Sequence, residues 1–418
     1  MTSSIKTNQR TQLVWVSNQT EARVDILSVQ FCTVHIKEDL NTIPTLDNSP
    51  CQGITEFKEE CVVGQYPPKG RPSVPTYTVN LDAPPEHRWA AVVKDKGPAL
   101  AHLLKEFKKF FLAFGQVPKD IIGFVDKDLG FLADTLPAPY GQEIKGIANI
   151  TGLPLGEVVM FNIFYEIFSA CTSIVAENPQ GKDALSRKEF GLCWQNHSWV
   201  VTEALRPMVI NLNFERAGKI VFKSAGFAGY IGVITGMKPG LFTLTVNERF
   251  AVSGGYIGIL QWILGNRSIQ WMSFLTRQTL EKSVDYEDAR TTLKEAKLLA
   301  PAYFIVGGNK TGQGCIITRS RTESVDVWDL GTRNSSWFLL ETNYDHWKAP
   351  LFVDDRRTPG NRCMNKLGQK NVGFPGLFDV LSSRPVLNKL TAYTCLMQVN
   401  SGTLETYLQH CPDPCSPW

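Results

Sequence analysis

One cysteine, Cys171, stands where a long apolar segment gives way to a part of the chain with many short β-type runs. The polar residues that could assist a thiol there are Arg187, Glu189, Glu248 and those of two clusters at 343–347 and 354–358. A thiolate with cationic and amide neighbours is suited to nucleophilic attack on a carbonyl carbon. Taken singly, each of these residues is more typical of a structural role, such as a buried thiol, an ion pair or a charged turn.

The elements that must position these residues differ on the two sides of Cys171. Before it, apolar residues between 100 and 114 recur at helical spacing, with Pro98 at the N1 position of the predicted helix. Their wide apolar face predicts a core-facing helix or, alternatively, a surface that binds lipid. Residues 155–170 predict a deeply buried helix that ends just before the cysteine.

After Cys171, short β-rich runs alternate with glycine, and one helical stretch near 273–299 interrupts them. The predicted strands are 77–81, 173–176, 199–202, 208–212, 219–222, 231–234, 241–246, 303–306, 314–318 and 336–340. Strands in two sets with helices between them favour a layered α+β fold. Residues 1–58 are polar and lack periodicity, which predicts a poorly structured extension.

Composition excludes several classes of protein. The 418 residues are 43% hydrophobic and 20% charged, as in ordinary globular proteins. With 43 basic and 40 acidic residues spread along the chain, the net charge of +3 gives no footprint of a nucleic-acid partner. No apolar run is long enough to predict a membrane-spanning helix, and no signal peptide is visible near the N-terminus.

The ten cysteines are too few for a disulfide scaffold, but their positions are informative. Cys411 and Cys415 flank two prolines, a spacing that suits a local disulfide better than a zinc site. The six histidines show no ligand spacing near a cysteine pair, so no metal is expected. Asn-x-Ser/Thr sequons are a second hint of the secretory route, and the candidate glycosylation sites are Asn149, Asn196, Asn266, Asn309 and Asn334.

Taken together, several strings of the sequence resemble those of the acid ceramidase family, over roughly residues 59–418. The run Phe161-Asn-Ile-Phe-Tyr-Glu-Ile-Phe-Ser-Ala-Cys171-Thr-Ser-Ile-Val-Ala-Glu177 is similar to the autocleavage region of that family. Further similar strings are Asn247-Glu-Arg-Phe250, Thr342-Asn-Tyr-Asp345, Asp354-Asp-Arg-Arg-Thr-Pro359 and the Cys411-Pro-Asp-Pro-Cys415 tail. The related N-acylethanolamine acid amidases share some of these strings but not the tail, which favours ceramidase.

The resemblance implies an αββα sandwich of the N-terminal-nucleophile hydrolases, with a helical α-chain at 59–170 and a catalytic β-chain at 171–418. Cleavage between Ala170 and Cys171 would create an α-amine on the residue of the nucleophile itself. That amine can accept the thiol proton, so neither histidine nor a cofactor is needed. The implied reaction is hydrolysis of the ceramide amide to sphingosine and a fatty acid.

The resemblance also implies roles for individual residues. Asn343 would donate to the oxyanion, Arg187 would favour the thiolate, and Arg356, hydrogen-bonded with Glu248, would shape the substrate pocket. Glu189 stands, across a gap, for the aspartate that holds the α-amine in the family. The segment Leu185-Ser-Arg-Lys-Glu-Phe-Gly191 is the part of the chain that departs most from the family pattern.

Further implied features concern disulfides, partners and location. The pairs are Cys61 with Cys363 and Cys411 with Cys415. The substrate would be ceramide or a related N-acyl lipid in a lysosome, met at a membrane surface or on a lipid-presenting activator protein. The alternatives are an N-acylethanolamine acid amidase and a catalytically impaired lipid-binding homologue.

Overall fold

The structure is a computed structural model that describes residues 61–70, 73–113, 129–163, 166, 170–179, 184–191, 198–250, 254–332, 337–413 and 415. Side chains are described for these residues except 110–113, 170, 184–191, 198–200, 254, 256 and 353. Residues Glu59–Trp418 form one compact unit, distinct from Met1–Lys58. The predicted extension at 1–58 lies outside the described residues.

Two β-sheets form the centre of the compact unit. The larger has the order β1 (Thr76–Asn80), β4 (Val209–Arg216), β5 (Lys219–Phe227), β6 (Thr235–Lys238), β7 (Phe242–Glu248), β8 (Ala302–Gly308), β9 (Gly314–Arg319) and β10 (Ser324–Asp329). The smaller has the order β11 (Phe338–Glu341), β2 (Ala170–Glu177), β3 (Ala184–Gly191), β12 (Thr391–Gln398) and β13 (Thr403–Leu408). All neighbouring strands are antiparallel except β1 and β4, which are parallel.

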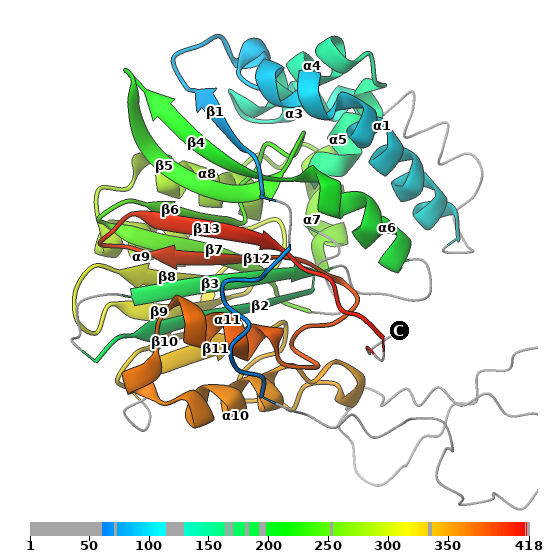
Figure 1. The fold of residues 1–418 in the computed structure, drawn as a ribbon. Helices are drawn as coiled ribbons and strands as arrows, with labels where there is room; N and C mark the ends of the chain where they lie inside the picture. Colours follow the sequence, from blue (N-terminus) through cyan, green and yellow to red (C-terminus); the bar gives the residue numbers. More distant parts are fainter. Residues whose placement is uncertain are drawn as a thin grey trace, which may run out of the picture. The chain divides into compact units, whose positions relative to one another are not determined.

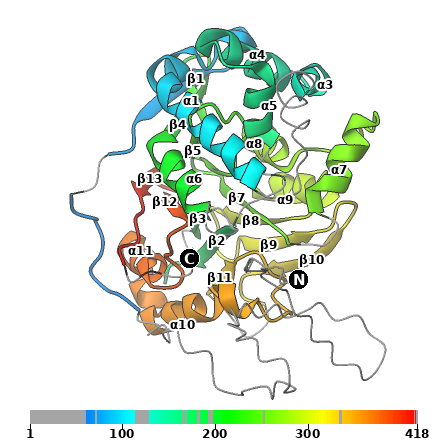
Figure 2. The ribbon, with the colours of Figure 1, turned by 90° about the vertical axis from the view of Figure 1, so that its right-hand side faces the viewer.

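The sheets stack face to face, and helices cover both outer faces (Figures 1 and 2). Helices α8 (Met272–Lys282) and α9 (Tyr286–Glu295) pack on the larger sheet, whereas α10 (Arg357–Leu367) and α11 (Phe374–Ser382) pack on the smaller one. Strand β2 shows why both faces of its sheet are covered, because its successive side chains point to opposite faces and belong to different apolar clusters. Val175 packs with Tyr303 of the facing sheet, and Ile174 packs with Leu377 of α11. The predicted αββα sandwich is confirmed.

The region before Cys171 is mainly helical, as predicted. Its helices are α1 (Ala90–Ala113), α3 (Leu132–Thr135), α4 (Tyr140–Thr151) and α5 (Leu155–Ile163), and α1 also packs against α6 (Ser198–Leu205) (Figure 1). Leu100, Leu103, Leu104 and Phe107 are buried, so this part of the apolar face of α1 belongs to the core. The described side chains of α1 end before Phe110, and the rest of that face lies outside them.

Four local predictions are wrong. Helix α1 begins at Ala90 and contains Pro98 in its interior, because the buried residues Val92 and Val93 extend the same core-facing side. Ala170 is the first residue of β2, where it pairs with Gly191, and α5 ends at Ile163. The predicted strand at 199–202 belongs to helix α6, and the run 231–234 lies before β6 rather than in a strand.

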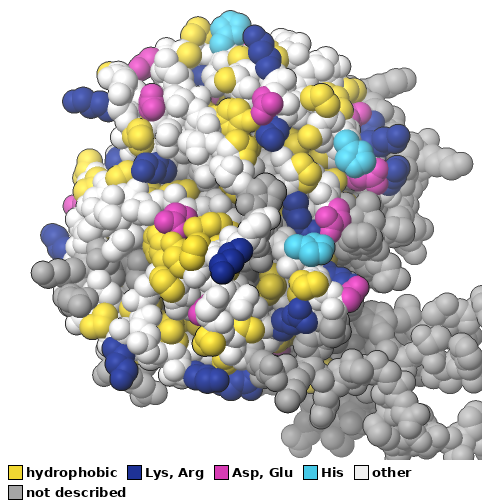
Figure 3. Space-filling view, in the orientation of Figure 1, with side chains coloured by type: hydrophobic (Ala, Val, Ile, Leu, Met, Phe, Trp, Pro, Cys, Tyr) yellow, Lys and Arg dark blue, Asp and Glu magenta, His cyan; other side chains and the backbone are white. Residues whose placement is uncertain are grey.

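Both disulfides implied by the resemblance are present. Cys61 is joined to Cys363, a link between the segments before and after Cys171, and Cys411 is joined to Cys415. Among the described helices, none is long and apolar enough to cross a membrane. Basic and acidic side chains are scattered among neutral and apolar ones on the face in Figure 3, in line with the small net charge.

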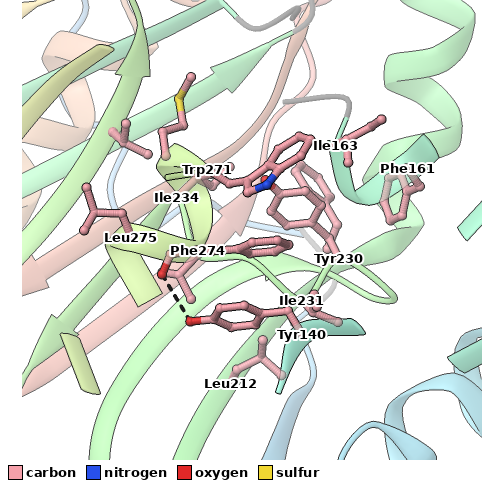
Figure 4. Close-up of a cluster of buried hydrophobic side chains, with 14 of the residues drawn as sticks. Tyr140, Phe161, Ile163, Leu212, Tyr230, Ile231, Ile234, Trp271, Phe274 and Leu275 are labelled. Atoms are coloured by element: carbon pink, nitrogen blue, oxygen red, sulfur yellow. Dashed lines mark hydrogen bonds between the residues drawn. The ribbon is translucent and has the colours of Figure 1, made fainter. Parts of the chain in front are cut away.

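A buried ionic cluster also joins the two parts of the chain. Glu143 of α4 is fully buried and accepts hydrogen bonds from Arg277 of α8, Arg88 and Trp89. Burial acts to raise the pKa of Glu143, but the charge and hydrogen bonds of Arg277 hold it below its usual value. Tyr140 stacks on Phe274 beside this cluster (Figure 4). The carboxylate is therefore ionised and fully engaged.

We predict that Arg277→Met lowers the free energy of unfolding by about 3–5 kcal/mol, because it leaves the buried Glu143 charge short of its main partner. The double variant Glu143→Leu/Arg277→Met should recover much of this loss. Denaturant unfolding measures both. Arg216 of β4 forms an exposed ion pair with Glu281 of α8, the helix that also carries Arg277. Arg216→Met removes this pair and serves as the control, with an expected loss below about 0.5 kcal/mol. Equal losses for the two single variants would contradict the role of Glu143.

Candidate active site

Cys171 lies near the start of β2, in the interior between the two sheets. Its side chain is 1% exposed and belongs to the main apolar core. Strand β2 is an inner strand, paired with β11 on one side and β3 on the other, so its main chain has little freedom. Ala170 and Cys171 are consecutive residues of this strand, and the nitrogen of Cys171 is a peptide nitrogen.

That nitrogen is held by Asn343, which follows the end of β11. The Cys171 N–H donates to Asn343 Oδ1 over 2.9 Å, and both residues are buried. Asn343 Nδ2 in turn donates to the carbonyl oxygen of Glu248, at the end of β7, over 2.8 Å. The Asn343 amide is therefore fixed between the two sheets with its oxygen toward the cysteine.

Arg356 holds the other polar group of the Cys171 main chain. Its Nη1 donates to the Cys171 carbonyl oxygen over 2.6 Å and to Thr172 Oγ1 over 3.2 Å. Its Nη2 donates to Asn343 Oδ1 over 2.7 Å. One buried guanidinium thus contacts the carbonyl of the cysteine directly and its nitrogen through Asn343.

Asp354 orients this guanidinium. Its two carboxylate oxygens accept from Arg356 Nε over 2.8 Å and from Nη2 over 2.9 Å, a bidentate ion pair with little exposure to solvent. The Tyr344 hydroxyl donates to the same carboxylate over 3.0 Å. The sequence indicates a polar cluster at 354–358, but only the fold assigns different roles to its members.

Asn247 holds the strands next to Cys171 together, a role that the sequence analysis does not predict. Ser173 Oγ donates to Asn247 Oδ1 over 2.7 Å, and Asn247 Nδ2 donates to the carbonyl oxygens of Glu341 and Thr342. These bonds connect β7 with β2 and β11 across the space between the sheets. The sequence could have indicated this role, because Asn247 directly follows an apolar run that predicts a buried strand. A buried amide must find hydrogen-bond partners.

Two carboxyl groups near the site are held in opposite protonation states. Burial opposes ionisation of Asp345, but hydrogen bonds from Arg249 and Tyr303 lower its pKa to about 2. Burial raises the pKa of Glu341 to about 8. In a mildly acidic medium Asp345 therefore stays ionised while Glu341 is neutral.

Glu248 and Phe250 lie on the other side of Asn343. Glu248 is 7% exposed, and its main-chain oxygen is the acceptor described above. The Phe250 N–H donates to the Asn343 carbonyl oxygen over 3.2 Å, and its half-exposed ring meets Tyr344 edge to face. The hydrogen bond between the side chains of Glu248 and Arg356 stays a prediction.

Arg187 and Glu189 lie on β3, whose main chain is described but whose side chains are not. Pairing sets Phe190 opposite Cys171, Glu189 opposite Thr172 and Arg187 opposite Ile174. Both residues thus lie on the strand next to the one that carries Cys171. Their roles toward the thiol and the α-amine stay predictions.

The sequons occupy varied surroundings. Asn149 is exposed at the end of α4, and Asn266 and Asn309 are partly buried, the latter donating through Nδ2 to the Gly240 carbonyl. Asn196 and Asn334 lie outside the described residues.

Within the described part of the chain, no group of three or more His, Cys, Asp or Glu residues could hold a metal ion.

Comparison with known proteins places this arrangement in a family. Residues 171–359 match the family model of linear amide C-N hydrolases, choloylglycine hydrolase family, and residues 72–136 match that of the beta subunit of N-acylethanolamine-hydrolyzing acid amidase. The first match begins at Cys171 and ends just after Arg356 and Arg357, so it spans every residue of the site described above.

Curated relatives match over most of the chain. Acid ceramidase of Homo sapiens is 50% identical over 370 residues, covering 87% of this chain and 93% of its own. Acid ceramidase of Mus musculus is 48% identical over 375 residues, covering 88% of this chain and 95% of its own.

Two solved structures are also similar. A Caenorhabditis elegans N-acylethanolamine-hydrolyzing acid amidase ortholog is 31% identical and has a TM-score of 0.49, covering 57% of this chain and 100% of its own. A mutant conjugated bile acid hydrolase of Clostridium perfringens is 11% identical with a TM-score of 0.35, covering 57% of this chain and 89% of its own. The extent and identity of the curated matches show that this chain belongs to the acid ceramidase family, among the linear amide C-N hydrolases of N-terminal-nucleophile type.

Proposed function

We propose that this chain hydrolyses the amide bond of ceramide to sphingosine and a free fatty acid, with Cys171 as the nucleophile after cleavage of the Ala170–Cys171 bond. The relatives that match over most of the chain are acid ceramidases. The observation that carries the mechanism is the buried network in which Asn343 and Arg356 hold both main-chain polar groups of Cys171.

Cleavage would turn the Cys171 nitrogen into an α-amine already held by Asn343. The amine accepts the proton of the thiol, and the thiolate forms a bond to the amide carbon of the substrate. The C–N bond then breaks, the amine returns its proton to the leaving nitrogen, and sphingosine departs. Water, deprotonated by the same amine, attacks the thioester carbon and releases the fatty acid and the thiol.

The remaining groups would stabilise charge or hold geometry. Asn343 carries two N–H groups on Nδ2, one directed at the Glu248 carbonyl, and we assign the other to the oxyanion. Arg187 would favour the thiolate, and Glu189 would hold the α-amine from the neighbouring strand. Glu248 and Arg356 would border the substrate beside the scissile amide.

An acidic compartment is the proposed location, a lysosome in the case of this family. An α-amine with a pKa near 7.7–8.0 and a thiol near 8.5 are mostly protonated there, so cationic neighbours must lower both values. The ionised Asp345 and the Arg249 with which it pairs keep their charges under these conditions. The substrate would be met at a membrane surface or on an activator protein that presents lipid.

Two other functions have specific support. The match of residues 72–136 to an N-acylethanolamine-hydrolyzing amidase subunit favours an N-acylethanolamine as a second substrate class. The glutamate at 189, in place of the aspartate of the family, favours a lipid-binding homologue with weak catalysis.

We predict that the purified chain, incubated at acidic pH, yields two fragments that remain one band without reductant because Cys61 and Cys363 stay joined. The second fragment should begin at Cys171. Cys171→Ala should remain a single chain near 46.7 kDa with and without reductant. Cys315→Ala, at another buried cysteine, is the control and should be cleaved like the wild type. An intact wild-type chain, or a cleaved Cys171→Ala variant, would exclude the proposed mechanism.

Fatty-acid release from ceramide and from N-palmitoylethanolamine in the same detergent distinguishes the two substrate classes. For a ceramidase we expect kcat/KM for ceramide to be at least about tenfold higher, a difference of about 1.4 kcal/mol in transition-state binding. The opposite ratio would support the amidase. Release from neither substrate by a fully cleaved chain would support the lipid-binding homologue.

We further predict that Asp354→Asn slows both self-cleavage and turnover by roughly 10–100-fold, because a neutral amide cannot replace the bidentate ion pair that orients Arg356. The rate of cleavage and kcat/KM for ceramide measure this. The matched control is Asp355→Asn. Asp355 accepts from the Thr358 N–H at the start of α10, a capping contact that asparagine can also make. Equal effects of the two variants would argue against a specific role for Asp354.

A further inference from the structure

Glu166 is a buried acid that the proposed chemistry does not use. It lies between Ile163, where α5 ends, and Ala170, where β2 begins, and therefore in the segment that precedes the scissile bond. Its side chain is fully buried. A buried carboxyl group is costly unless it is neutral or well paired, so its retention in this segment requires a physical reason.

The carboxyl group and the main-chain carbonyl of Glu166 both contact helices that follow Cys171 in the chain. Its Oε1 accepts from the Ser273 N–H in the first turn of α8 over 3.3 Å. Its main-chain oxygen lies against Gly255, near the start of α7 (Gly254–Ile263), where an added Cβ would be only 2.1 Å from that oxygen. The close approach requires glycine at 255, and it places residue 166 between two helices.

The second carboxyl oxygen of Glu166 is buried, as are the neighbouring side chains of Ser273 and Tyr230. Among the described residues, Glu166 Oε2 has no hydrogen-bond partner. Tyr230, also buried, interacts with both Glu166 and Ser273. Figure 4 shows Tyr230 in an aromatic part of the core, and its ring meets that of Phe161 edge to face.

Burial raises the pKa of Glu166 to about 8, so in an acidic medium the side chain is a neutral acid. A neutral acid has one O–H, which can donate to Ser273 Oγ while the carbonyl oxygen keeps the α8 contact. A neutral Glu166 adds no negative charge to the core.

We infer that Glu166 is a positioning residue for self-cleavage, which fixes the main chain at residue 166, four positions before Ala170, to α7 and α8. This inference rests on the proposed cleavage between Ala170 and Cys171. Attack by the thiol on the Ala170 carbonyl carbon needs the two atoms at about 3–3.5 Å in line, and a displacement of about 1 Å costs roughly 100-fold in rate. Turnover of ceramide has no such requirement, because the mature site is built from residues at and after Cys171.

The test compares Glu166→Gln and Glu166→Leu in the full chain at acidic pH. Glutamine has the shape of the protonated acid and can make both hydrogen bonds, so its self-cleavage rate should lie within about threefold of the wild type. Leucine fills the volume but cannot accept from Ser273, so its cleavage should be at least about tenfold slower. The cleaved fraction of each variant, normalised to its amount of N-terminal Cys171, should have wild-type kcat and KM for ceramide.

Leu132→Ala is the control for general destabilisation, because Leu132 is fully buried in α3 and lies in the same helical region. If it lowers the melting temperature as much as Glu166→Leu does and slows cleavage equally, the positioning role is wrong. Cleavage of Glu166→Leu at the wild-type rate, or an equal loss of turnover after cleavage, also overturns it. A wild-type chain that never cleaves overturns the proposed function itself and this inference with it.

Discussion

The hydrogen bonds that Arg356 makes, directly and through Asn343, to hold the main chain of Cys171 are the constraint on which the site depends. A guanidinium can serve several acceptors in one plane, and Arg356 reaches the Cys171 carbonyl, Thr172 and Asn343 while its remaining edge faces Asp354. Because the site is buried, these charge-assisted bonds are stronger than they would be in water. The arrangement needs β2, the end of β11 and the start of α10 at fixed separations, which is what the stacked layers supply.

Buried carboxyl groups divide into two classes that suit an acidic medium. Asp345 and Glu143 face arginines, and their pKa values are lowered, so their contribution to stability is present above the unfolded-state pKa and is lost only as the pH falls through the lower native value. Glu166 and Glu341 lack such partners, and burial raises their pKa values to about 8. For these two, stability is greatest below the unfolded-state value near 4.5 and declines as the pH rises toward 8.

The parts before and after Cys171 are joined by contacts that do not involve the bond between Ala170 and Cys171. The Cys61–Cys363 disulfide is covalent, and the Glu143–Arg277 pair lies in the core that α4 shares with α8. β1 adds main-chain hydrogen bonds by pairing with β4. A cut in β2 would therefore leave the helical region attached to the sheets, with the new amine still in reach of Asn343.

The sequence by itself determined the class of fold and most strands, because alternating and continuous apolar runs with glycine breaks report directly on sheet packing. It failed at 199–202, where β-branched residues form helix α6, and at Pro98, which lies inside α1; at both places packing against neighbouring elements outweighs local propensity. Only the tertiary structure decided the hydrogen-bond partners of Cys171. Asn343 is 172 positions away and Arg356 is 185, and no local pattern encodes which distant polar groups meet when two sheets stack. Asn247, Asp354 and Glu166 look like ordinary polar residues in the sequence, and their roles follow from burial, which forces each polar atom to find a partner within the fold.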